Sequence, residues 1–386
     1  MEDTMADFET LPVGRLSIAA CEGSKEFCKR VDEYLIEWRE ERAKTNPYED
    51  YTRDTYMVGI KQPRFSSGEA KCELLESVRG DDLYILVDVC NYSITYKAFG
   101  EINHMSPDDH YQNLKRVIDA AAGKARKITV IMPFLYESRQ HKKTGRESMD
   151  CAYALQELRS IGVNNIITFD AHDPRVQNAI PLSSFDNVRP SYQFIKALLK
   201  SVPDVVVDSN HLMVISPDEG AMSRAVYLAT VLGVDVGMFY KRRDYSQVVN
   251  GTNPIIEHEF LGADVEGKDV LIIDDMIASG TSIIDVARQL KERKAARVFA
   301  CATFGLFTSG LEVFDKCYEE GLIDKIFTTN LIYQNPELLE KPYYVSVDMA
   351  KYVALIIDTL NHEASMQNLL DPYDRINAIL EKHKKQ

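Results

Sequence analysis

The stretch VLIIDDMIASGTS, Val270 to Ser282, decides the fold class of this 386-residue chain. Four aliphatic residues lead directly into the adjacent carboxylates Asp274 and Asp275, and five of the next seven residues are small. An aliphatic run of this kind is typical of a strand buried on both faces of a parallel sheet. The small residues predict a tight turn from this strand into a helix.

Similar aliphatic runs recur along the chain, from LSIAAC at Leu16 to RVFACATFG at Arg297. Amphipathic segments such as TSIIDVARQLKERKA separate many of these runs. Strands that alternate with helices predict an α/β fold with mostly parallel sheets flanked by helices.

A weak internal repeat indicates two domains. VRGDDLYILVD at Val78 resembles VEGKDVLIIDD at Val265, and each is followed by a second strand, a helix and a third strand. The same order of units appears twice, which predicts two tandem, duplicated domains. The polar stretch KSVPDVVVDSN places the boundary near Lys200, so we expect domains at 1–200 and 201–386, with the last helix free to pack elsewhere.

The composition excludes some partners. The formal charge of −14 argues against a nucleic-acid partner or an anionic membrane surface, since both bind a basic face. No apolar run approaches the roughly 18 residues that a membrane span needs. The seven cysteines are scattered without metal-ligand spacing, which favours free thiols in a reducing compartment. The acidic amino terminus does not resemble a signal peptide, and we expect a cytoplasmic protein.

The turn after the acidic pair has the chemistry of a phosphate site. Backbone N–H groups at a helix start, with the hydroxyls of Ser279, Thr281 and Ser282, form a cradle for phosphate. Asp274 and Asp275 would repel that phosphate, so we expect them to accept hydrogen bonds from vicinal sugar hydroxyls. The alternative is that the two acids only stabilise the start of the next helix.

This motif resembles the phosphoribosyl-diphosphate signature of the phosphoribosyltransferase superfamily. Further segments narrow the resemblance to the ribose-phosphate pyrophosphokinase family, whose motifs include RFSDGE, ARQDRK and SPDxGGxxRA. The matches follow the family's order from about Leu16 to Asp371. The segments concerned are RFSSGE at Arg64, SRQHKKTGRES at Ser138, TFDAHDPRVQNAI at Thr168, ISPDEGAMSRA at Ile215 and YKRRD at Tyr240.

The resemblance implies two phosphoribosyltransferase-like domains and a diphosphokinase reaction for nucleotide biosynthesis. The C1 hydroxyl of ribose 5-phosphate would attack the β-phosphorus of Mg·ATP and release AMP. By the same resemblance, Asp274 and Asp275 hold ribose hydroxyls, and the 5-phosphate is bound by Ala278, Ser279, Gly280, Thr281 and Ser282.

The resemblance also assigns the remaining site residues. Catalysis falls to Lys241, Arg243 and His172, and Mg²⁺ to His172 and Asp218. The diphosphate would lie along Asp218, Glu219, Gly220 and Ala221. ATP would be bound by Phe65, Glu69, Arg139 and Gln140. The family further implies a homo-oligomer built from dimers, often a hexamer.

Each assignment has a simpler alternative. His172 could be an ordinary polar residue at a strand end, Asp218 a turn acid and Phe65 a core residue. The KRRD run could be a solvated charge cluster, but it precedes YSQVVNGTNPIIEHEFLG (residues 245–262), which is long for a connection and is consistent with a mobile lid.

The chain departs from the family pattern at several positions. Ser67 replaces an Asp of RFSDGE, and Lys142 stands where Arg is usual, which loses a bidentate donor. Ala278 replaces an Asp that serves as a base in 6-oxopurine transferases, which counts against that subclass. The segment Asn91–Asn113 is longer than the usual connection. Small changes also occur within two motifs, at Thr281 and Ala221.

Three functions therefore remain open. The leading one is an active ribose-phosphate diphosphokinase, because the motifs follow that family's order and the chain retains Lys241, Arg243, His172, Asp218, Asp274 and Asp275. A phosphoribosyltransferase that consumes the diphosphate would need only one such domain, so the duplication argues against it. A non-catalytic homologue that regulates an active partner stays open because of the substitutions on the ATP side.

Overall fold

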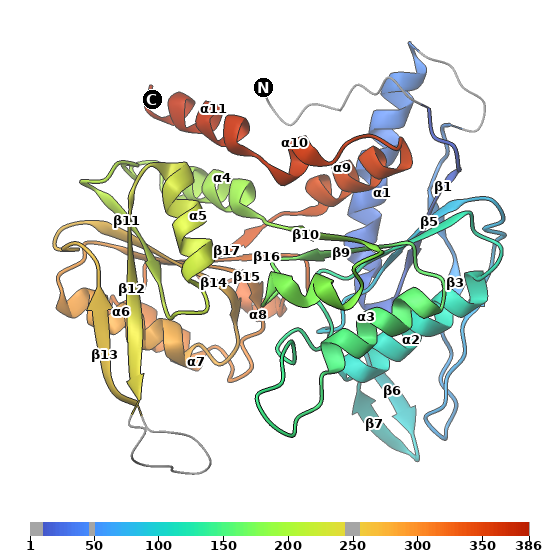
Figure 1. Ribbon diagram of the computed structural model, residues 1–386, viewed down its shortest axis with the longest axis horizontal. Helices are drawn as coiled ribbons and strands as arrows, with labels where there is room; N and C mark the ends of the chain where they lie inside the picture. Colours follow the sequence, from blue (N-terminus) through green and yellow to red (C-terminus); the bar gives the residue numbers. More distant parts are fainter. Residues whose placement is uncertain (1–10, 46–50, 244–254, 386) are drawn as a thin grey trace. The chain divides into compact units, whose positions relative to one another are not determined.

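The structure is a computed structural model that describes residues 11–45, 51–243 and 255–385, with the side chains of residues 241–243 and 255–258 outside that description. The chain forms two compact units (Figure 1). Unit 1 consists of Met1–Pro190, Asn330–Tyr333 and Asp348–Asp371. Unit 2 consists of Ser191–Thr329, Gln334–Val347 and Pro372–Gln386.

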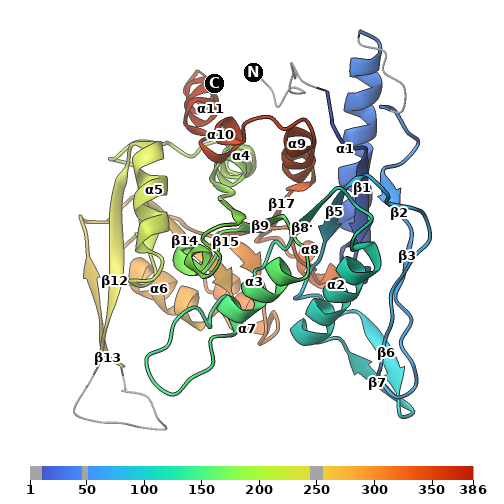
Figure 2. The ribbon, with the colours of Figure 1, turned by 45° about the vertical axis from the view of Figure 1, so that its right-hand side comes forward.

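Unit 1 is built on a six-stranded parallel sheet in the order β10-β9-β8-β5-β1-β2. The strands are β1 (Leu16–Ala20), β2 (Met57–Val58), β5 (Asp82–Leu86), β8 (Lys127–Ile131), β9 (Asn165–Phe169) and β10 (Ser184–Val188). Helices α2 and α3 cover one face, and α1 and α9 pack together on the other (Figure 2). The helices are η1 (Glu22–Ser24), α1 (Lys25–Ala43), α2 (Pro107–Ala121), α3 (Asp150–Ser160), η2 (Pro174–Ala179), α9 (Ala350–Asn361) and α10 (Gln367–Leu370).

Two short antiparallel hairpins extend from the body of unit 1. One pairs β3 (Ile60–Lys61) with β4 (Glu73–Leu74), and the other pairs β6 (Thr95–Ala98) with β7 (Glu101–His104). The second hairpin lies within the inserted segment Asn91–Asn113, so the insertion is an ordered hairpin followed by the start of α2.

Unit 2 contains a seven-stranded sheet in the order β13-β12-β11-β14-β15-β16-β17, in which only the β12–β13 pair is antiparallel. The strands are β11 (Leu212–Ser216), β12 (Asp235–Arg243), β13 (Ile255–Leu261), β14 (Asp269–Ile277), β15 (Val298–Gly305), β16 (Lys325–Thr329) and β17 (Tyr344–Val347). The helices are α4 (Ser191–Ser201), α5 (Met222–Leu232), α6 (Thr281–Glu292), α7 (Glu312–Glu319), α8 (Pro336–Leu339) and α11 (Tyr373–His383).

The two sheets share one topology. In chain order, β1, β2, β5, β8, β9 and β10 occupy the same sheet positions as β11, β12, β14, β15, β16 and β17, and β13 is an added edge strand. The repeated sequences at Val78 and Val265 therefore lead into β5 and β14, which hold corresponding central positions. The predicted α/β class and the duplication are both confirmed.

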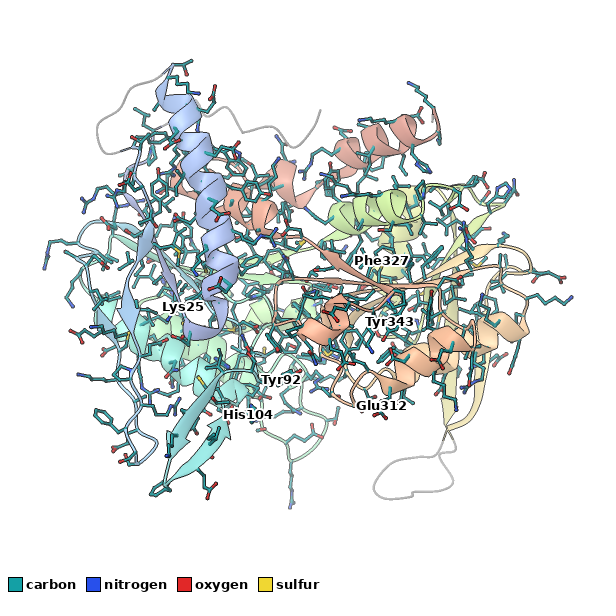
Figure 3. The ribbon with its side chains drawn as sticks, turned by 180° about the vertical axis from the view of Figure 1, so that it is seen from behind. Lys25, Tyr92, His104, Glu312, Phe327 and Tyr343 are labelled. Carbon is teal, nitrogen blue, oxygen red and sulfur yellow. The ribbon has the colours of Figure 1, made fainter. Side chains whose placement is uncertain are left out.

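Strand β14 is covered on both faces, which explains its unbroken aliphatic run. Val270 and Ile272 belong to a core that contains side chains of α6, α7 and α8. Leu271 and Ile273 belong to a second core, formed with α4, α5 and α11. Phe327 on β16, the second strand along the sheet from β14, is fully buried in this second core (Figure 3).

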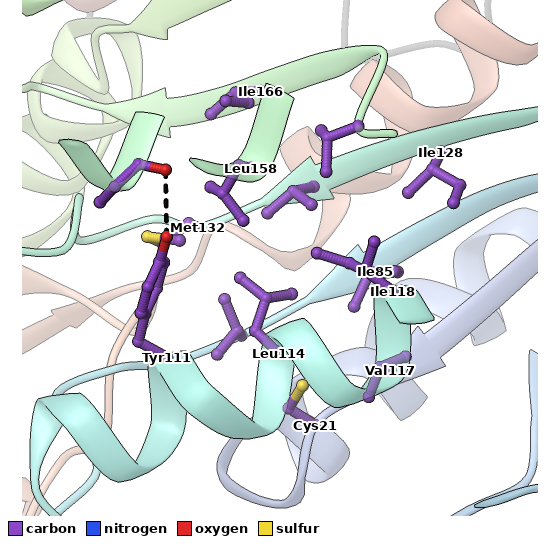
Figure 4. Packing of buried hydrophobic residues seen from close by; sticks show 14 of the residues in the cluster. Cys21, Ile85, Tyr111, Leu114, Val117, Ile118, Ile128, Met132, Leu158 and Ile166 are labelled. Atoms are coloured by element: carbon purple, nitrogen blue, oxygen red, sulfur yellow. Dashed lines mark hydrogen bonds between the residues drawn. The ribbon is translucent and has the colours of Figure 1, made fainter. Parts of the chain in front are cut away.

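The core of unit 1 on the α2–α3 face has the same character. Leu114, Val117 and Ile118 of α2 pack against Ile85 and other strand residues (Figure 4). Their spacing of three and four residues places them on one side of the helix. Pro107 follows a capping box formed by Ser106 and Asp109, so the helix start is specified locally.

The division of the chain differs from the continuous ranges 1–200 and 201–386 that we expected. Helix α4 packs on α11, β16 and β17 in unit 2, so the first boundary lies before Ser191. Helix α9 packs on α1, which places Asp348–Asp371 in unit 1. An ion pair contributes to this placement of α9 in addition to hydrophobic packing, because Asp358 of α9 lies 3.0 Å from the buried Arg39 of α1.

The cysteines occur as free thiols, five of them buried. Burial raises the pKa of the Cys21 thiol to about 12, which keeps it protonated and unreactive at neutral pH. Within residues 11–45, 51–243 and 255–385, no helix is long and apolar enough to cross a lipid bilayer.

Candidate active site

The acidic pair lies inside the last part of β14 and not beyond its end. The strand continues to Ile277, which is in register with Gly305 of β15. Asp275 is 4% exposed, and its Oδ2 lies 3.7 Å from Nη2 of Arg224 on α5. Asp274 accepts a hydrogen bond from the Asp275 amide at 2.8 Å. Both carboxyls are thus held by a rigid element.

The two carboxyls influence each other's charge. Desolvation raises the pKa of Asp274 well above its ordinary value, and the charges of Asp275 and Asp218 raise it further. A protonated Asp274 also gains a hydrogen bond with Asp275. The pair therefore lowers its own repulsion by holding a proton. Ribose hydroxyls, which donate hydrogen bonds, would favour the ionised form.

The loop after β14 has the geometry of an anion cradle. Gly280 has φ +86°, and a Cβ there would lie 2.1 Å from Cζ of Phe314, so only glycine fits. Helix α6 begins at the next residue, and its first turn contains no acidic side chain. The Ala278 carbonyl accepts from the Thr308 amide at 2.9 Å, which fixes the loop. The positive end of the helix dipole and its first amides therefore lie at this loop.

The diphosphate motif lies at the end of the neighbouring strand, β11. Asp218 Oδ1 accepts hydrogen bonds from the amides of Gly220 at 2.9 Å and Ala221 at 3.3 Å. The Ser216 hydroxyl donates to the Asp218 carbonyl at 2.6 Å. Asp218 thus caps a turn that leads into α5, as the simpler alternative predicts. Because β11 and β14 are adjacent and parallel, their carboxyl ends bring this turn and the acidic pair to one edge of the sheet.

The predicted cationic residues are described only in part. Lys241 and Arg243 lie at the end of β12, beside β11, but their side chains are outside the described residues. Of the predicted lid at 245–262, residues 245–254 are also outside the described residues. Residues 255–261 form β13, paired with β12, so the expected loop is shorter than the sequence indicated.

The residues assigned to ATP occupy two loops of unit 1. Arg64 to Ala70 form a tight turn closed by the Phe65 amide and the Glu69 carbonyl at 2.7 Å. Phe65 is 52% exposed, so the alternative that it is a core residue is wrong. Arg139 and Gln140 are exposed in the turn after β8.

His172 lies just after β9, in a strained segment. Asp170 has φ +41°, which is uncommon outside glycine and is often associated with functional sites. The ring of His172 is 5.4 Å from that of His141. Asp173 binds Arg175, and this hydrogen bonding lowers the pKa of Asp173 to about 2.

Comparison with known proteins now decides the family. Residues 16–162 match the family described as the N-terminal domain of ribose phosphate pyrophosphokinase, and residues 182–337 match the phosphoribosyl transferase domain. The ribose-phosphate pyrophosphokinase of Mycoplasma pneumoniae is 30% identical over 294 residues, 75% of this chain and 81% of that protein. The chain belongs to the ribose-phosphate pyrophosphokinase family.

Other relatives agree. The ribose-phosphate pyrophosphokinase of Synechococcus elongatus is 29% identical over 310 residues, 79% of this chain and 84% of that protein. The crystal structure of phosphoribosylpyrophosphate synthetase from Mycobacterium smegmatis has a TM-score of 0.70 at 22% identity, and covers 91% of this chain and 100% of its own. The predicted family and the predicted enzyme class are confirmed, and the structural likeness supports the fold.

Sequence reasoning missed one residue beside the predicted metal ligand. His141 stands where the family's ARQDRK segment has Asp, and its Nε2 lies 3.5 Å from Asp173. Its Nδ1 is buried and has no hydrogen-bond partner in the part of the chain that the structure describes. The sequence feature that could have indicated His141 is its imidazole in SRQHKK, at a position where the family segment has Asp. Only the fold shows that it lies next to His172.

The two units of the chain differ at the ends of their equivalent central strands, β5 and β14. Asp88 follows β5 at the position equivalent to Asp275. It accepts hydrogen bonds from the amides of Cys90 at 2.8 Å and Tyr333 at 2.6 Å. Desolvation raises the pKa of Asp88 to about 7. Unit 1 thus retains one acid, used to hold two loops, and lacks the small-residue turn.

The residues fit a magnesium ion in part. The carboxylate of Asp218 is a hard oxygen donor of the kind Mg²⁺ prefers, whereas the imidazole of His172 suits it less. Among the described residues, no group of three or more His, Cys, Asp or Glu side chains is arranged to hold a metal.

Proposed function

We propose that this enzyme transfers the β,γ-diphosphoryl group of Mg·ATP to the C1 hydroxyl of ribose 5-phosphate, giving 5-phosphoribosyl 1-diphosphate and AMP. The observation that carries the proposal is the edge of unit 2. There the turn from Asp218 to Ala221 and the Asp274–Asp275 pair lie at the ends of the adjacent strands β11 and β14. Residues 278–280, here called the Gly280 loop, connect β14 to α6.

The residues would divide the substrate between them. The amides of the Gly280 loop and the start of α6 bind the 5-phosphate, where the helix dipole favours an anion. Asp274 and Asp275 accept hydrogen bonds from the ribose hydroxyls, and Arg224 holds Asp275 in place. These contacts fix the sugar and orient its C1 hydroxyl, which is how positioning lowers the barrier of a phosphoryl transfer.

The ATP side completes the proposal. Phe65 offers an exposed ring for the base, and Glu69, Arg139 and Gln140 offer polar groups. Lys241 and Arg243 would stabilise the charge that develops on the transferred group. Bound Mg²⁺ would neutralise phosphate oxygens. Cytoplasmic location and a dimer-based homo-oligomer stay predictions.

The test is phosphorus NMR of the purified protein with ribose 5-phosphate, ATP and Mg²⁺. We expect AMP and a sugar 1-diphosphate to appear together. Lys241→Ala should lower kcat by about 100-fold or more, as expected for loss of a group that stabilises transition-state charge. Unchanged ATP with folded protein would contradict the proposal and favour the non-catalytic regulatory homologue.

A further inference from the structure

We propose that hairpin β6–β7 positions the Phe65–Glu69 loop for nucleotide binding, and that Tyr96 is its positioning residue. The inference rests on the proposed function, because it assigns the nucleotide to this loop. The hairpin belongs to the segment Asn91–Asn113, which the family pattern does not contain at this length.

The hairpin is firmly anchored at its base. The Asn91 amide group donates to the Gly23 carbonyl at 2.9 Å, and the Met105 amide donates to the Ile94 carbonyl at 2.9 Å. His104 and Tyr92 lie together where the hairpin starts and ends, with Nδ1 of His104 2.7 Å from the Tyr92 carbonyl (Figure 3). Hydrogen bonds across the base therefore hold the two ends of the hairpin together, and the Asn91–Gly23 bond connects this base to the rest of unit 1.

The tip of the hairpin has the geometry of a tight two-residue turn. Phe99 and Gly100 both have positive φ, as in a type I′ turn, which suits the twist of the strands. The Phe99 amide is thereby free of the ladder and donates to the Ser66 carbonyl at 2.9 Å. The turn thus contributes a backbone contact to the neighbouring loop, and this contact does not depend on the Phe99 side chain.

The side-chain contact is made by Tyr96. Cζ of Arg64, the first residue of the RFSSGE segment, lies 4.0 Å from the centre of the Tyr96 ring. Nη1 of Arg64 donates to the Gly68 carbonyl and to Asp109, each at 3.0 Å. Nη2 is buried and has no hydrogen-bond partner within the described residues. The aromatic face therefore supplies the favourable contact for that side of the guanidinium.

These contacts matter because the loop is otherwise exposed. Phe65, Ser66, Ser67 and Glu69 are all exposed, and the bonds within the loop fix its shape but not its direction. Arg64 directly precedes the loop and donates a hydrogen bond to the Gly68 carbonyl in its turn. Tyr96 and Asp109 in turn hold the Arg64 side chain. We therefore expect the direction in which Phe65 and Glu69 point to depend on the hairpin.

The experiment compares Tyr96→Leu with the matched control Tyr96→Phe in the full chain. Tyr96→Phe keeps the ring face and loses only the hydroxyl. We expect Tyr96→Leu to raise the KM for ATP about fivefold to tenfold, with kcat and the KM for ribose 5-phosphate near the wild-type values. Tyr96→Phe should stay within about twofold of wild type, and Phe99→Ala should also have little effect.

The outcomes separate this inference from the proposed function. An active wild type with an unchanged KM for ATP in folded Tyr96→Leu would overturn the inference alone. A wild type without diphosphoryl transfer would overturn the proposed function, and equilibrium dialysis with ATP then decides the inference. Weaker ATP binding in Tyr96→Leu but not in Tyr96→Phe supports it, and equal or absent binding overturns it.

Discussion

At the scale of single residues, Gly280 shows how much can depend on one missing Cβ. Several other glycines also have a positive φ, but at Gly280 an added Cβ would in addition overlap the ring of Phe314. Gly321 also has positive φ, yet nothing lies within 4 Å of an added Cβ there. The two positions therefore separate backbone strain from steric overlap.

We predict that Gly280→Ala lowers the free energy of unfolding by about 2 to 4 kcal/mol, from strain plus overpacking. Gly321→Ala should cost only about 1 kcal/mol, from backbone strain alone. Urea denaturation of both variants measures the difference. Equal losses would show that the overlap with Phe314 relaxes without cost. In Gly280→Ala we also expect a higher KM for ribose 5-phosphate.

Asp88 gives a prediction about pH. Its pKa in the folded protein is about 7, above the value of 3.8 in the unfolded chain, so the folded state retains a proton that the unfolded state has lost. The stabilising effect of that proton is complete below about pH 4 and is lost as pH rises through 7. As pH rises from 5 to 8, ionisation of this group should lower the free energy of unfolding by about 2 to 3 kcal/mol.

The variant Asp88→Asn tests this effect. It cannot ionise, and its single amide oxygen can accept from only one of the two backbone amides that Asp88 binds. We expect lower stability at pH 5 but a flatter dependence on pH. Urea denaturation of both proteins at pH 5 and pH 8 measures the slope. Parallel slopes in wild type and variant would contradict the assigned pKa.

At the scale of elements, helix α9 is held on α1 by a buried charge cluster. Arg39 is 2% exposed and Asp358 is 1% exposed, and Arg42 and Asn361 complete the hydrogen bonds. A buried ion pair contributes little net stability, but removal of one partner leaves an uncompensated charge. The cluster therefore specifies where α9 packs more than how tightly it packs.

We predict that Asp358→Ala destabilises unit 1 by about 3 to 5 kcal/mol, because Arg39 and Arg42 lose their buried counter-ion. The double variant Arg39→Met with Asp358→Leu should recover part of that loss. Thermal unfolding of the two variants measures both effects. A double variant less stable than the single one would show that the ion pair itself is strongly stabilising.

At the scale of the whole molecule, the repeat was visible in the sequence because each copy is specified locally. A strand buried on both faces needs a continuous aliphatic run, and β5 and β14 each provide one at the same point of the same topology. The candidate site in unit 2 followed for the same reason, since Asp274 directly follows such a run and Asp218 comes two residues after the end of β11. Asp218 and Asp274 come to the same edge of the sheet because their strands, β11 and β14, are adjacent and parallel.

Contacts between distant segments could not be predicted in this way. Nothing in the hydrophobic pattern of α9 indicates whether it packs in unit 1 or unit 2, because an apolar helix face fits many partners. His141 and His172 are 31 positions apart in the chain. Tyr96 and Arg64 come from an insertion and a loop with no shared periodicity. Each of these contacts depends on which distant segments of the chain the tertiary fold brings together.

The sequence by itself therefore determined the α/β class, the duplication and the glycine-containing turn after the acidic pair, because strand burial and turn geometry are short-range requirements. The tertiary structure alone decided that α9 joins unit 1, that His141 lies beside His172 and that the β6–β7 hairpin holds the Phe65–Glu69 loop. The physical reason is the same in all three cases. Long-range packing selects one partner among many that are locally equivalent, and only the folded chain makes that selection.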